Sequence, residues 1–475
     1  MNHEGFAEFA ARVNLLSLFD HSGRAGNSFF LTIFDQHPQV LTCHWVHYVY
    51  SYLVTEFGEA SLLDSRRAHD FLVKRSYFRY VFRDLDESLA RDMSKFGADP
   101  ASVIDRTEAR RAFAEIVLAR QTISRRELVL AAYYAFARGL GRDTRPVRHV
   151  LAADAVSLRF ENILAGFGGA ACRAVFVDFP RAKAISLVRD PRANFASNRH
   201  QFVNSQGNMY GLRPGGFLAG LGDLYQGRLA MGQGCVYLFW LAYFASAARV
   251  MERIKSEQGG LFRTVRNEDL NTNFLPTMQG LCAWLGVDML EEWARPDYEP
   301  TSVGRPWRGT GAYNDRYQTN RHGPLKNDPP QVAAKVTGPN VYVTRRWRSR
   351  MSPQEIGLME TLFRDELTAL GYEFLRYPQA GGEDRRFRSD LLRPMLGETP
   401  RLAWVAEGLA LGWREVGRRL HYALAWPVYY AAGRLALARL WRRGFFHAGG
   451  GPKGQGPAGG ITTEPARAAG KGTSR

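Results

Sequence analysis

A short glycine-rich stretch near the start of the chain, GRAGNS at 23–28, has the residue types that bind a phosphate or a sulfate. Gly23 and Gly26 allow a tight turn and a close approach of an anion to the backbone. Arg24 supplies a positive charge, and Ser28 is a predicted N-cap for the helix that follows. Because a helix N-terminus directs several backbone N–H groups toward one point, the stretch predicts an anion-binding loop.

The loop differs from the usual nucleotide-triphosphate loop, which ends in Gly-Lys followed by Ser or Thr and uses the lysine to reach the β- and γ-phosphates. Here Asn27 follows Gly26, and the basic residue, Arg24, comes before the second glycine. A magnesium-dependent kinase or NTPase is therefore disfavoured, although it stays an alternative. A plain glycine turn that joins a strand to a helix is the other alternative.

A second candidate anion site lies in LVRDPRANFAS at 187–197. Arg189 follows a short apolar run, and Ser197 comes eight residues later, on a predicted helix. An arginine can bind a phosphate dianion through two N–H groups, and a nearby hydroxyl can donate to a further oxygen. The pair is chemically compatible with a phosphate, and the alternative is a surface arginine with an unrelated serine.

These candidate residues must be positioned by alternating strands and helices. Short apolar runs, each followed by a helix-like stretch, predict strands at 14–19, 185–188 and 261–265. His37-Pro38 ends the first of the helices, because proline disfavours helical geometry in the residue before it. Strands that alternate with helices are typical of a parallel sheet, so the expected fold class is α/β, a three-layer parallel sheet flanked by helices.

The remaining predicted elements are mainly helical. The charged segment 48–142 has a helical appearance and no residues that indicate a reaction. Ser352 and Glu355 form a predicted capping box at the start of a helix that Gly371 ends. The segment 304–340 is rich in Gly, Pro, Asn and Arg, and a loop of this length inside a compact domain is usually functional.

Composition limits the partners of this protein. The chain has 475 residues, with 63 Lys and Arg against 46 Asp and Glu, a formal net charge of +17. From 381 to the end there are 16 basic and 7 acidic residues, so +9 of that charge lies in the tail. A front part that is only mildly basic, without a recognisable nucleic-acid module, disfavours nucleic acid as a partner. The four cysteines are scattered without metal-ligand spacing, so we expect reduced thiols and no metal site.

The two anion sites together resemble those of the sulfotransferases that use 3′-phosphoadenosine 5′-phosphosulfate (PAPS). In that family the 5′-phosphosulfate loop reads basic-Ser-Gly-Thr-Thr, and the helix after it ends in Leu-Leu-Asp-x-His-Pro. The corresponding residues here are RAGNS at 24–28 and IFDQHP at 33–38, in which Ala25 and Asn27 replace hydroxyl residues. The arginine and serine at the ends of 189–197 match the family's 3′-phosphate site.

The resemblance implies a sulfotransferase that moves a sulfuryl group from PAPS to a hydroxyl of an acceptor and leaves PAP as product, without a metal. It assigns the donor contacts to six residues of this chain: the 3′-phosphate to Arg189 and Ser197, the 5′-phosphate to the backbone amides of Gly26, Asn27 and Ser28, and the charge of the sulfuryl group to Arg24.

The resemblance also directs attention to a base for the acceptor hydroxyl. Many relatives place a glutamate just past the His-Pro segment, but QVLTCHWVH at 39–47 contains no carboxylate. His44 is the nearest match, with His47 expected one helical turn further on. A neutral imidazole is a suitable base near pH 7, so His44 is the predicted base. The alternative is that His44 packs beside Trp45.

Weaker matches follow in the same order. VRNEDL at 265–270 resembles the family's Tyr-Glu-Asp-Leu segment, except that Asn267 replaces a tyrosine that packs near adenine. The segment 343–373 resembles the closing pattern with Trp-Arg and Leu-Gly-Tyr, and 305–317 resembles the loop before it. The resemblance spans about half of the chain, at 15–45, 174–200, 262–287 and 306–373.

The sequence divides into a catalytic domain at 1–377, a basic amphipathic helical extension at 378–446 and a disordered tail at 447–475. Within the catalytic domain, the segment 48–142 is expected to shape the acceptor pocket or to form a lid over it.

The expected cellular location of the protein follows from the C-terminal extension at 378–446. At 414–443 Arg alternates with Trp, Tyr and Leu, as in helices that lie on a membrane surface. With no signal peptide or membrane span predicted, we expect a cytoplasmic protein that contacts the inner membrane surface through 400–446, which would suit a carbohydrate or glycolipid acceptor. The alternatives are that these aromatic residues pack on the catalytic domain or form an oligomer contact, and that the protein is a non-enzymatic binder of membranes or polyanions.

Overall fold

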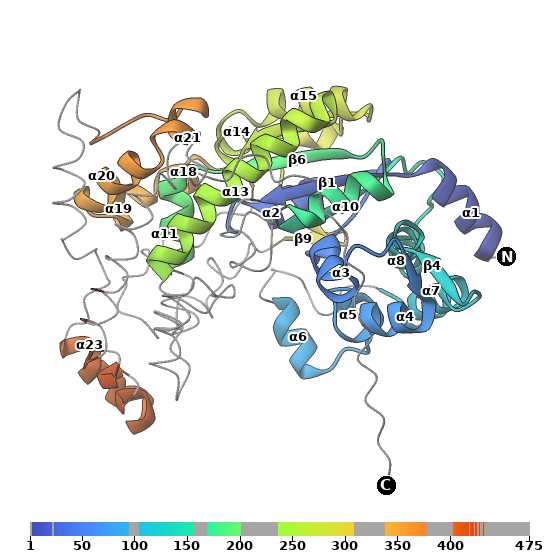
Figure 1. Cartoon of the computed structure of the whole chain (residues 1–475), viewed down its shortest axis with the longest axis horizontal. Helices are drawn as coiled ribbons and strands as arrows, with labels where there is room; N and C mark the ends of the chain where they lie inside the picture. Colours follow the sequence, from blue (N-terminus) through green and yellow to red (C-terminus); the bar gives the residue numbers. More distant parts are fainter. Residues whose placement is uncertain are drawn as a thin grey trace, which may run out of the picture.

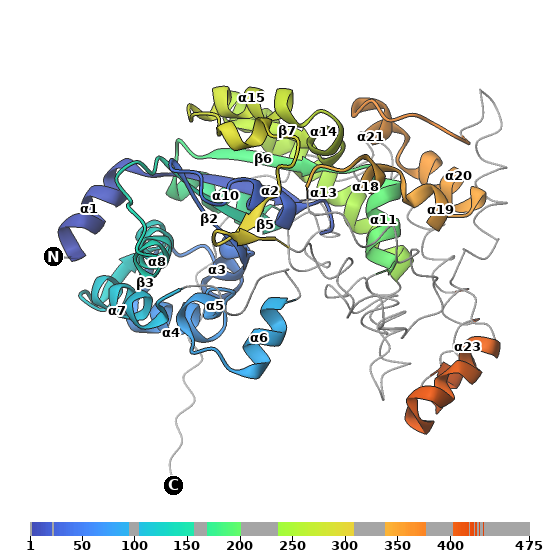
Figure 2. The same cartoon turned by 180° about the vertical axis from the view of Figure 1, so that it is seen from behind.

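The structure is a computed structural model of the chain, drawn from two opposite sides in Figures 1 and 2. The predicted loop at 304–340 lies largely outside the residues it describes, and the tail at 447–475 lies wholly outside them. The described residues are 2–20, 23–94, 104–155, 169–200, 236–307, 338–376 and 402–417, together with 419–421, 423, 424, 427 and 431.

A five-stranded sheet forms the centre of the molecule, and every neighbouring pair of its strands is parallel. The register of β2 against β5 shifts between Thr42 and His47, whereas β1 pairs with β5 over its whole length. The strands in spatial order are β2 (Val40–His47), β5 (His149–Ala155), β1 (Asn14–Asp20), β6 (Lys183–Val188) and β7 (Phe262–Arg266).

Strand β1 lies at the middle of this sheet, and its side chains supply both faces. Leu15 and Phe19 belong to one buried hydrophobic cluster, whereas Leu16 and Leu18 belong to a second one. Successive side chains of a strand point to opposite faces, so the two clusters lie on opposite sides of the sheet. Burial on both faces explains why the run from Leu15 to Phe19 is apolar except for the buried Ser17 and does not alternate regularly with polar residues.

Helices cover both faces, and the predicted three-layer α/β fold is confirmed. The cluster with Leu16 is completed by α2 (Asn27–Ile33) and α15 (Phe274–Leu285), and α15 lies above the sheet in Figure 1. The cluster with Leu15 is completed from the other side by α8 (Arg125–Gly139), α10 (Ala170–Asp178) and α13 (Val236–Gln258).

The segment between β2 and β5 is mainly helical, as predicted, and lies below the sheet in Figure 1. It also contains a short antiparallel pair of strands that the sequence did not predict. In addition to α8, its elements are α3 (Val49–Phe57), β3 (Leu62–Asp64), α4 (Ser65–Lys74), α5 (Arg79–Phe82), α6 (Glu87–Ser94), α7 (Arg106–Val117) and β4 (Thr122–Ser124).

The elements after β6 complete the domain. The predicted capping box of Ser352 and Glu355 is confirmed, but the helix expected to reach Gly371 is divided at Phe363 into α20 and α21. The elements are α11 (Pro191–His200), η2 (Gly259–Leu261), α14 (Asn267–Thr272), η3 (Glu291–Ala294), β8 (Thr301–Ser302), β9 (Arg305–Pro306), α18 (Val341–Arg345), α19 (Trp347–Arg350), α20 (Pro353–Leu362) and α21 (Arg364–Ala369), while α1 (Asn2–Arg12) precedes β1.

Two local expectations are wrong. Helix α2 begins at Asn27 with Gly26 as its N-cap, so Ser28 lies inside the helix and is not its cap. Glycine takes the cap position because its φ is 110°, a left-handed conformation that serine rarely adopts. His44 and His47 are not one helical turn apart, because both lie on β2, every residue of which is buried.

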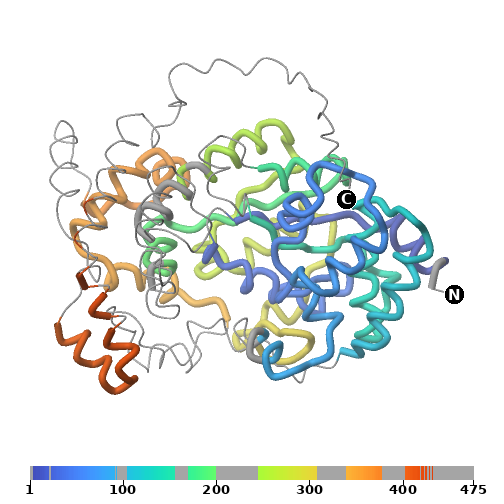
Figure 3. The backbone as a smooth tube through the Cα atoms, turned by 60° about the horizontal axis from the view of Figure 1, so that its bottom comes forward, coloured from blue at the N-terminus to red at the C-terminus, as the bar shows by residue number. Residues whose placement is uncertain are grey.

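In the C-terminal extension the structure describes α23 (Leu402–Ala406) and η4 (Glu407–Leu411). They lie at the edge of the molecule, far from α1 (Figure 3). Arg419 contacts α23, because its Nη1 donates to the carbonyl oxygen of Trp404 at 2.5 Å. Across the described part of the chain, no helix combines the length and the apolar character that crossing a bilayer requires.

Candidate active site at the carboxyl edge of the sheet

The loop after β1 is shaped by the buried carboxylate of Asp20. Its Oδ1 accepts from the backbone N–H of Gly23 at 3.1 Å, and its Oδ2 accepts from Asn27 Nδ2 at 2.5 Å. Burial raises the pKa of Asp20 to about 6, against the two hydrogen bonds, which act to lower it. Asp20 therefore holds both ends of the loop together. The sequence analysis missed it.

Gly26 is required for two separate reasons. Its φ of 110° is in the region that side chains disfavour, and a Cβ atom placed there would lie 2.1 Å from Asn267 Nδ2. Asn267 lies against the loop at the start of α14. An amide at this position packs closely on the glycine loop.

Three predicted donor-site residues come together although they are far apart in the sequence. Arg24 Nε donates to Ser197 Oγ at 3.3 Å across a separation of 173 residues. Arg189 Nη1 donates to the backbone carbonyl oxygen of Arg24 at 2.9 Å. Arg24 itself has a φ of 60°, a conformation that costs a residue with a side chain roughly 1–2 kcal/mol. The fold therefore concentrates two guanidinium groups and a hydroxyl beside the loop.

Two asparagines of α11 hold the other side of the loop. Asn194 Nδ2 donates to the carbonyl oxygen of Gly23 at 2.8 Å, and Asn198 Nδ2 approaches the same oxygen at 3.4 Å. Asn198 also donates to Asn194 Oδ1 at 2.7 Å. Residues four apart lie on one face of a helix, so this face of α11 presents two amides to the loop. The four-residue spacing of Asn194 and Asn198 is visible in the sequence, but no nearby residue indicated that their partner is the carbonyl oxygen of Gly23.

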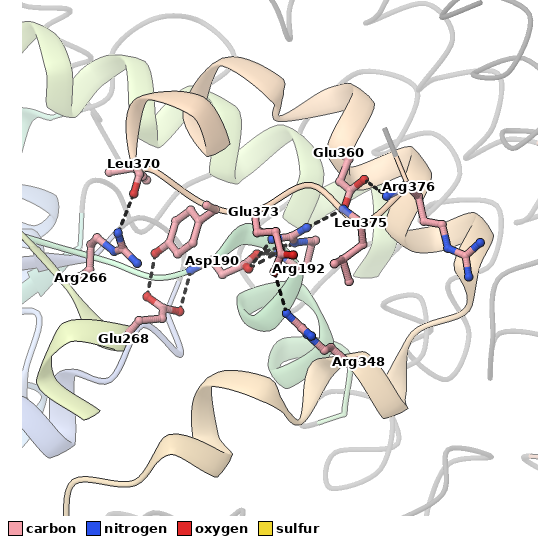
Figure 4. A network of polar contacts seen from close by, with 11 residues as sticks. Asp190, Arg192, Arg266, Glu268, Arg348, Glu360, Leu370, Glu373, Leu375 and Arg376 are labelled. Atoms are coloured by element: carbon pink, nitrogen blue, oxygen red, sulfur yellow. Dashed lines mark hydrogen bonds and ion pairs between the residues drawn. The ribbon is translucent and has the colours of Figure 1, made fainter. Parts of the chain in front are cut away.

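Arg192, close to Arg189, is the centre of a buried network of charges (Figure 4). It donates to both carboxylate oxygens of Asp190, at 2.9 and 2.8 Å, and to Glu360 Oε1 at 2.6 Å. Its guanidinium carbon lies 4.4 Å from the centre of the Trp347 ring. Glu360 in turn accepts from the backbone N–H groups at 375 and 376.

Glu268 connects this network to the neighbouring strand. Its Oε1 accepts from the backbone N–H of Asp190 at 3.1 Å, and its Oε2 accepts from the Tyr372 hydroxyl at 2.7 Å. Burial raises the pKa of Glu268, and the nearby charge of Asp190 raises it further. Trp347 and Tyr372, which belong to the segment 343–373, therefore pack against the residues that directly follow Arg189 and their partner Glu268.

His44 and His47 lie on β2, an edge strand of the sheet that β5 separates from β1. The His44 ring is 3% exposed and contacts Trp45 edge to face, with ring centres 5.1 Å apart. His47 is also buried, and burial lowers its pKa to about 4, so its imidazole is neutral at pH 7. The role of His44 as a base stays a prediction.

The Asp-x-His-Pro segment has a structural task. Asp35 Oδ2 accepts from Thr301 Oγ1 at 2.7 Å and from the backbone N–H of Gly304 at 2.9 Å. The two ring nitrogens of His37 contact the Asp288 carbonyl oxygen at 2.9 Å and the backbone N–H of Gln39 at 3.1 Å. These contacts fasten the end of α2 to later segments of the chain.

Asp154 at the end of β5 is a second buried carboxylate that the sequence analysis missed. It accepts from the backbone N–H groups of Tyr50 and Ser51, at 3.0 and 2.8 Å, and so holds the first turn of α3. Burial raises its pKa to about 7, against these hydrogen bonds. A charged residue at the end of the apolar run 149–155 was the available signal.

The described residues contain no group of three or more His, Cys, Asp or Glu side chains arranged to hold a metal ion. Cys43, Cys172 and Cys282 are buried free thiols, and Cys235 lies outside the described residues.

Comparison with known proteins adds likeness in structure but none in sequence. No protein-family model matches the chain, and no curated protein sequence matches it significantly. Among solved structures, a sulfotransferase domain from the curacin biosynthetic pathway is similar over 76% of this chain and 99% of its own, at a TM-score of 0.43 and 14% identity. The sulfotransferase domain of the Synechococcus PCC 7002 olefin synthase is similar over 77% of this chain and 97% of its own, at a TM-score of 0.40 and 14% identity.

Proposed function

We propose that this protein is a sulfotransferase that moves a sulfuryl group from PAPS to a hydroxyl of an acceptor. One observation carries the proposal. Arg24, Arg189 and Ser197 are the residues that the resemblance assigns to the two ends of one donor molecule, and Arg24 contacts both of the others beside the glycine loop. A cluster of two arginines and a hydroxyl is chemically suited to a ligand with more than one phosphate or sulfate group.

The donor contacts are those that the resemblance implies, and the chemistry of these groups is compatible with them. Arg189 and Ser197 would bind the 3′-phosphate, and the backbone amides of Gly26, Asn27 and Ser28 would face the 5′-phosphate. Ser197 can accept from Arg24 and still donate its own proton to a phosphate oxygen, because a hydroxyl has one donor and two acceptor positions.

Arg24 has the catalytic role in this proposal. Sulfuryl transfer needs an in-line nucleophile and stabilisation of the charge that develops on the moving group and on the oxygen that leaves. The guanidinium of Arg24 would supply that stabilisation from a backbone conformation that the fold holds in the left-handed region.

We assign the acceptor's base to His44, whose neutral imidazole would take the proton of the attacking hydroxyl. The assignment rests on the resemblance and on imidazole chemistry, and it places the base on β2, two strands from β1 in the sheet. The acceptor that we propose is a carbohydrate or glycolipid, reached in part from the inner membrane surface through the basic extension at 400–446.

Transfer of labelled sulfate from PAPS tests the proposal. The full-length protein is incubated with labelled PAPS and an extract of the source cells, and the product is identified by mass. Arg189→Ala is expected to remove both transfer and PAP binding, whereas His44→Ala is expected to remove transfer and leave PAP binding intact.

Equilibrium binding of PAP and of ATP with magnesium separates this function from the kinase alternative. We expect PAP to bind without magnesium and more tightly than ATP. Magnesium-dependent ATP binding without PAP binding would overturn the proposal, and so would near-normal transfer by Arg189→Ala.

A further inference from the structure

Three tyrosines form a cluster that the donor contacts do not use. Tyr48, Tyr52 and Tyr77 contact one another in all three pairs, with ring centres 5.8 to 6.3 Å apart. All three are half-buried, and Tyr52 and Tyr77 pack against the main hydrophobic cluster. We name these three residues the tyrosine platform.

The fold fixes the first part of the platform from the sheet edge. The backbone N–H of Tyr48 donates to the carbonyl oxygen of Ala153 at 2.7 Å. The carboxylate of Asp154, the next residue of β5, holds the following turn through Tyr50 and Ser51. Tyr52 lies one turn further along α3, so its ring is positioned by the same contacts.

A separate turn positions Tyr77. Ser76 Oγ donates to the carbonyl oxygen of Leu72 at 2.8 Å and accepts from the backbone N–H of Phe78 at 3.1 Å. Ser76 and Phe78 are both buried, while Tyr77 between them is half-buried. This turn therefore presents the Tyr77 ring to the rings of α3.

Backbone strain marks the point where the platform joins the strand. Tyr48 has a φ of 61°, in the left-handed region that costs an aromatic residue roughly 1–2 kcal/mol. Strain of this kind persists where the surrounding structure enforces it, and it is concentrated at binding and active sites. Here it turns the chain from β2 directly into α3.

The platform adjoins the candidate active site. The ring of His47, the last residue of β2, lies 5.9 Å from the Tyr48 ring and 6.1 Å from the Tyr77 ring. β2 and β1 lie on either side of β5, and His47 pairs with Ala153, which pairs with Leu18; His47 is therefore about 10 Å, two strand spacings, from Leu18, two residues before the end of β1. His44, the proposed base, is three residues earlier on the same strand.

The chemistry of the platform favours one class of ligand. Arg79 lies over the Tyr77 and Tyr80 rings, at 5.5 and 4.8 Å from their centres. Of these two rings only Tyr77 belongs to the platform, and the cation over it repels a second one, which disfavours an ammonium ligand of the kind that aromatic cages bind. Phenol rings with hydroxyl tips instead match a ligand that has an apolar face and a polar rim.

We propose that the tyrosine platform is the acceptor subsite and that it stacks on the C–H face of a pyranose ring beside His47, at the end of the strand that carries His44. The assignment deepens the proposed function and rests on it for the reaction. It gives the segment 48–142 a specific task, the recognition of a sugar.

Ligand-observed saturation-transfer NMR tests the assignment with the full-length protein. The probes are methyl β-D-glucopyranoside, methyl β-D-galactopyranoside and cellobiose, with choline and phenol in parallel. We expect the ring C–H protons of at least one sugar to receive saturation. Tyr52→Ala and Tyr77→Ala should each reduce that signal by about fivefold, the loss of one aromatic contact.

Two further variants separate ring contact from folding. Tyr52→Phe keeps the ring and should keep most of the signal. Phe57→Ala removes a half-buried ring from the other end of α3, where it contacts Phe71, and should leave the signal unchanged.

The assignment is overturned if no sugar of the set receives saturation, if both alanine variants keep the full signal, or if choline or phenol binds and the sugars do not. PAP titrations on the same samples keep the two proposals apart. PAP binding without sugar contact removes the platform assignment alone, whereas sugar contact without PAP binding removes the proposed sulfotransferase activity alone.

Discussion

The two sides of the candidate donor site are held by different chemistry. Behind Arg189, full charges interlock in the interior, with Arg192 between Asp190 and Glu360. Around Gly23, neutral amides of α11 and the carboxylate of Asp20 hold the loop. One side is thus a charged frame, and the other is a set of weaker and separate hydrogen bonds.

This difference fits the demands on each side. A buried ion network fixes the direction of each group strongly, at the risk of a large loss when one partner is removed. A loop that must admit an anion gains from neutral neighbours, because a full negative charge beside it would oppose the ligand. Asp20 is the exception, and burial keeps its pKa near 6.

The largest expected effect comes from breaking the charged frame. Arg192→Met leaves two buried carboxylates, Asp190 and Glu360, without their shared cation, and we expect the free energy of unfolding to fall by about 3–5 kcal/mol. Urea unfolding monitored by circular dichroism measures this loss.

An exposed arginine of the same region is the matched control. Arg348 pairs with Glu373 in solvent, with side chains 49% and 72% exposed. Arg348→Met should therefore change the free energy of unfolding by less than about 1 kcal/mol. Equal losses in the two variants would contradict the idea of a buried frame.

The next effect concerns pH and the carboxylate of the loop side. The pKa of Asp20 is about 6 in the folded protein, above its ordinary value of 3.8. Between these values the folded state holds a proton that the unfolded state has lost, so the contribution of Asp20 to stability falls as pH rises from about 4 to 6. Asp20→Asn removes this loss, and we expect it to gain up to about 3 kcal/mol on wild type across that window.

Urea unfolding at half-unit steps from pH 4.5 to 7.5 follows the difference between the two proteins. Because the charge of Asp20 also raises the pKa of Asp154, the difference should continue to grow slightly toward pH 7. If the difference in the free energy of unfolding between the two proteins does not change with pH, Asp20 is not the carboxylate that titrates beside the loop.

The close packing of the loop gives the third prediction. Gly26→Ala forces a methyl group against Asn267 Nδ2 in a conformation that alanine disfavours, and we expect a loss of about 2–3 kcal/mol together with loss of PAP binding. Gly23→Ala is the matched control, because Gly23 has a φ of 72° but nothing within 4 Å of a Cβ atom. Strain alone should cost it roughly 1–2 kcal/mol. If both variants lose stability equally, the contact with Asn267 has no energetic role.

The fold was predictable from sequence where apolar runs were clean. The strands near 14–19, 185–188 and 261–265 are confirmed as β1, β6 and β7. β2 and β5 were missed because VLTCHWVH and HVLAADA place His, Asp, Thr or Ala inside buried strands, where pattern alone indicates nothing regular. Parallel pairing in the sheet and burial decide their structure, and neither is local information.

The site was predictable only where spacing carried information. Arg24, Arg189 and Ser197 stand in motifs, and the fold brings them together. Asn194 and Asn198 gain their meaning from a carbonyl oxygen about 170 residues away, so no pattern within α11 could have shown it. Glu268 is similar, since its partners are Asp190 and Tyr372.

The smallest expected effect tests whether the two sides bind one ligand. Ser197 lies on the helix between the charged frame and the loop, and its hydroxyl accepts from Arg24. Ser197→Ala should weaken PAP binding by about tenfold, the worth of one hydrogen bond to a charged group, with little change in stability. AMP, which lacks the 3′-phosphate, is the matched ligand and should bind both proteins equally in calorimetric titrations. If AMP binding weakens as much as PAP binding, Ser197 acts through the loop and not on the 3′-phosphate, and the two sides cannot be assigned to opposite ends of one donor.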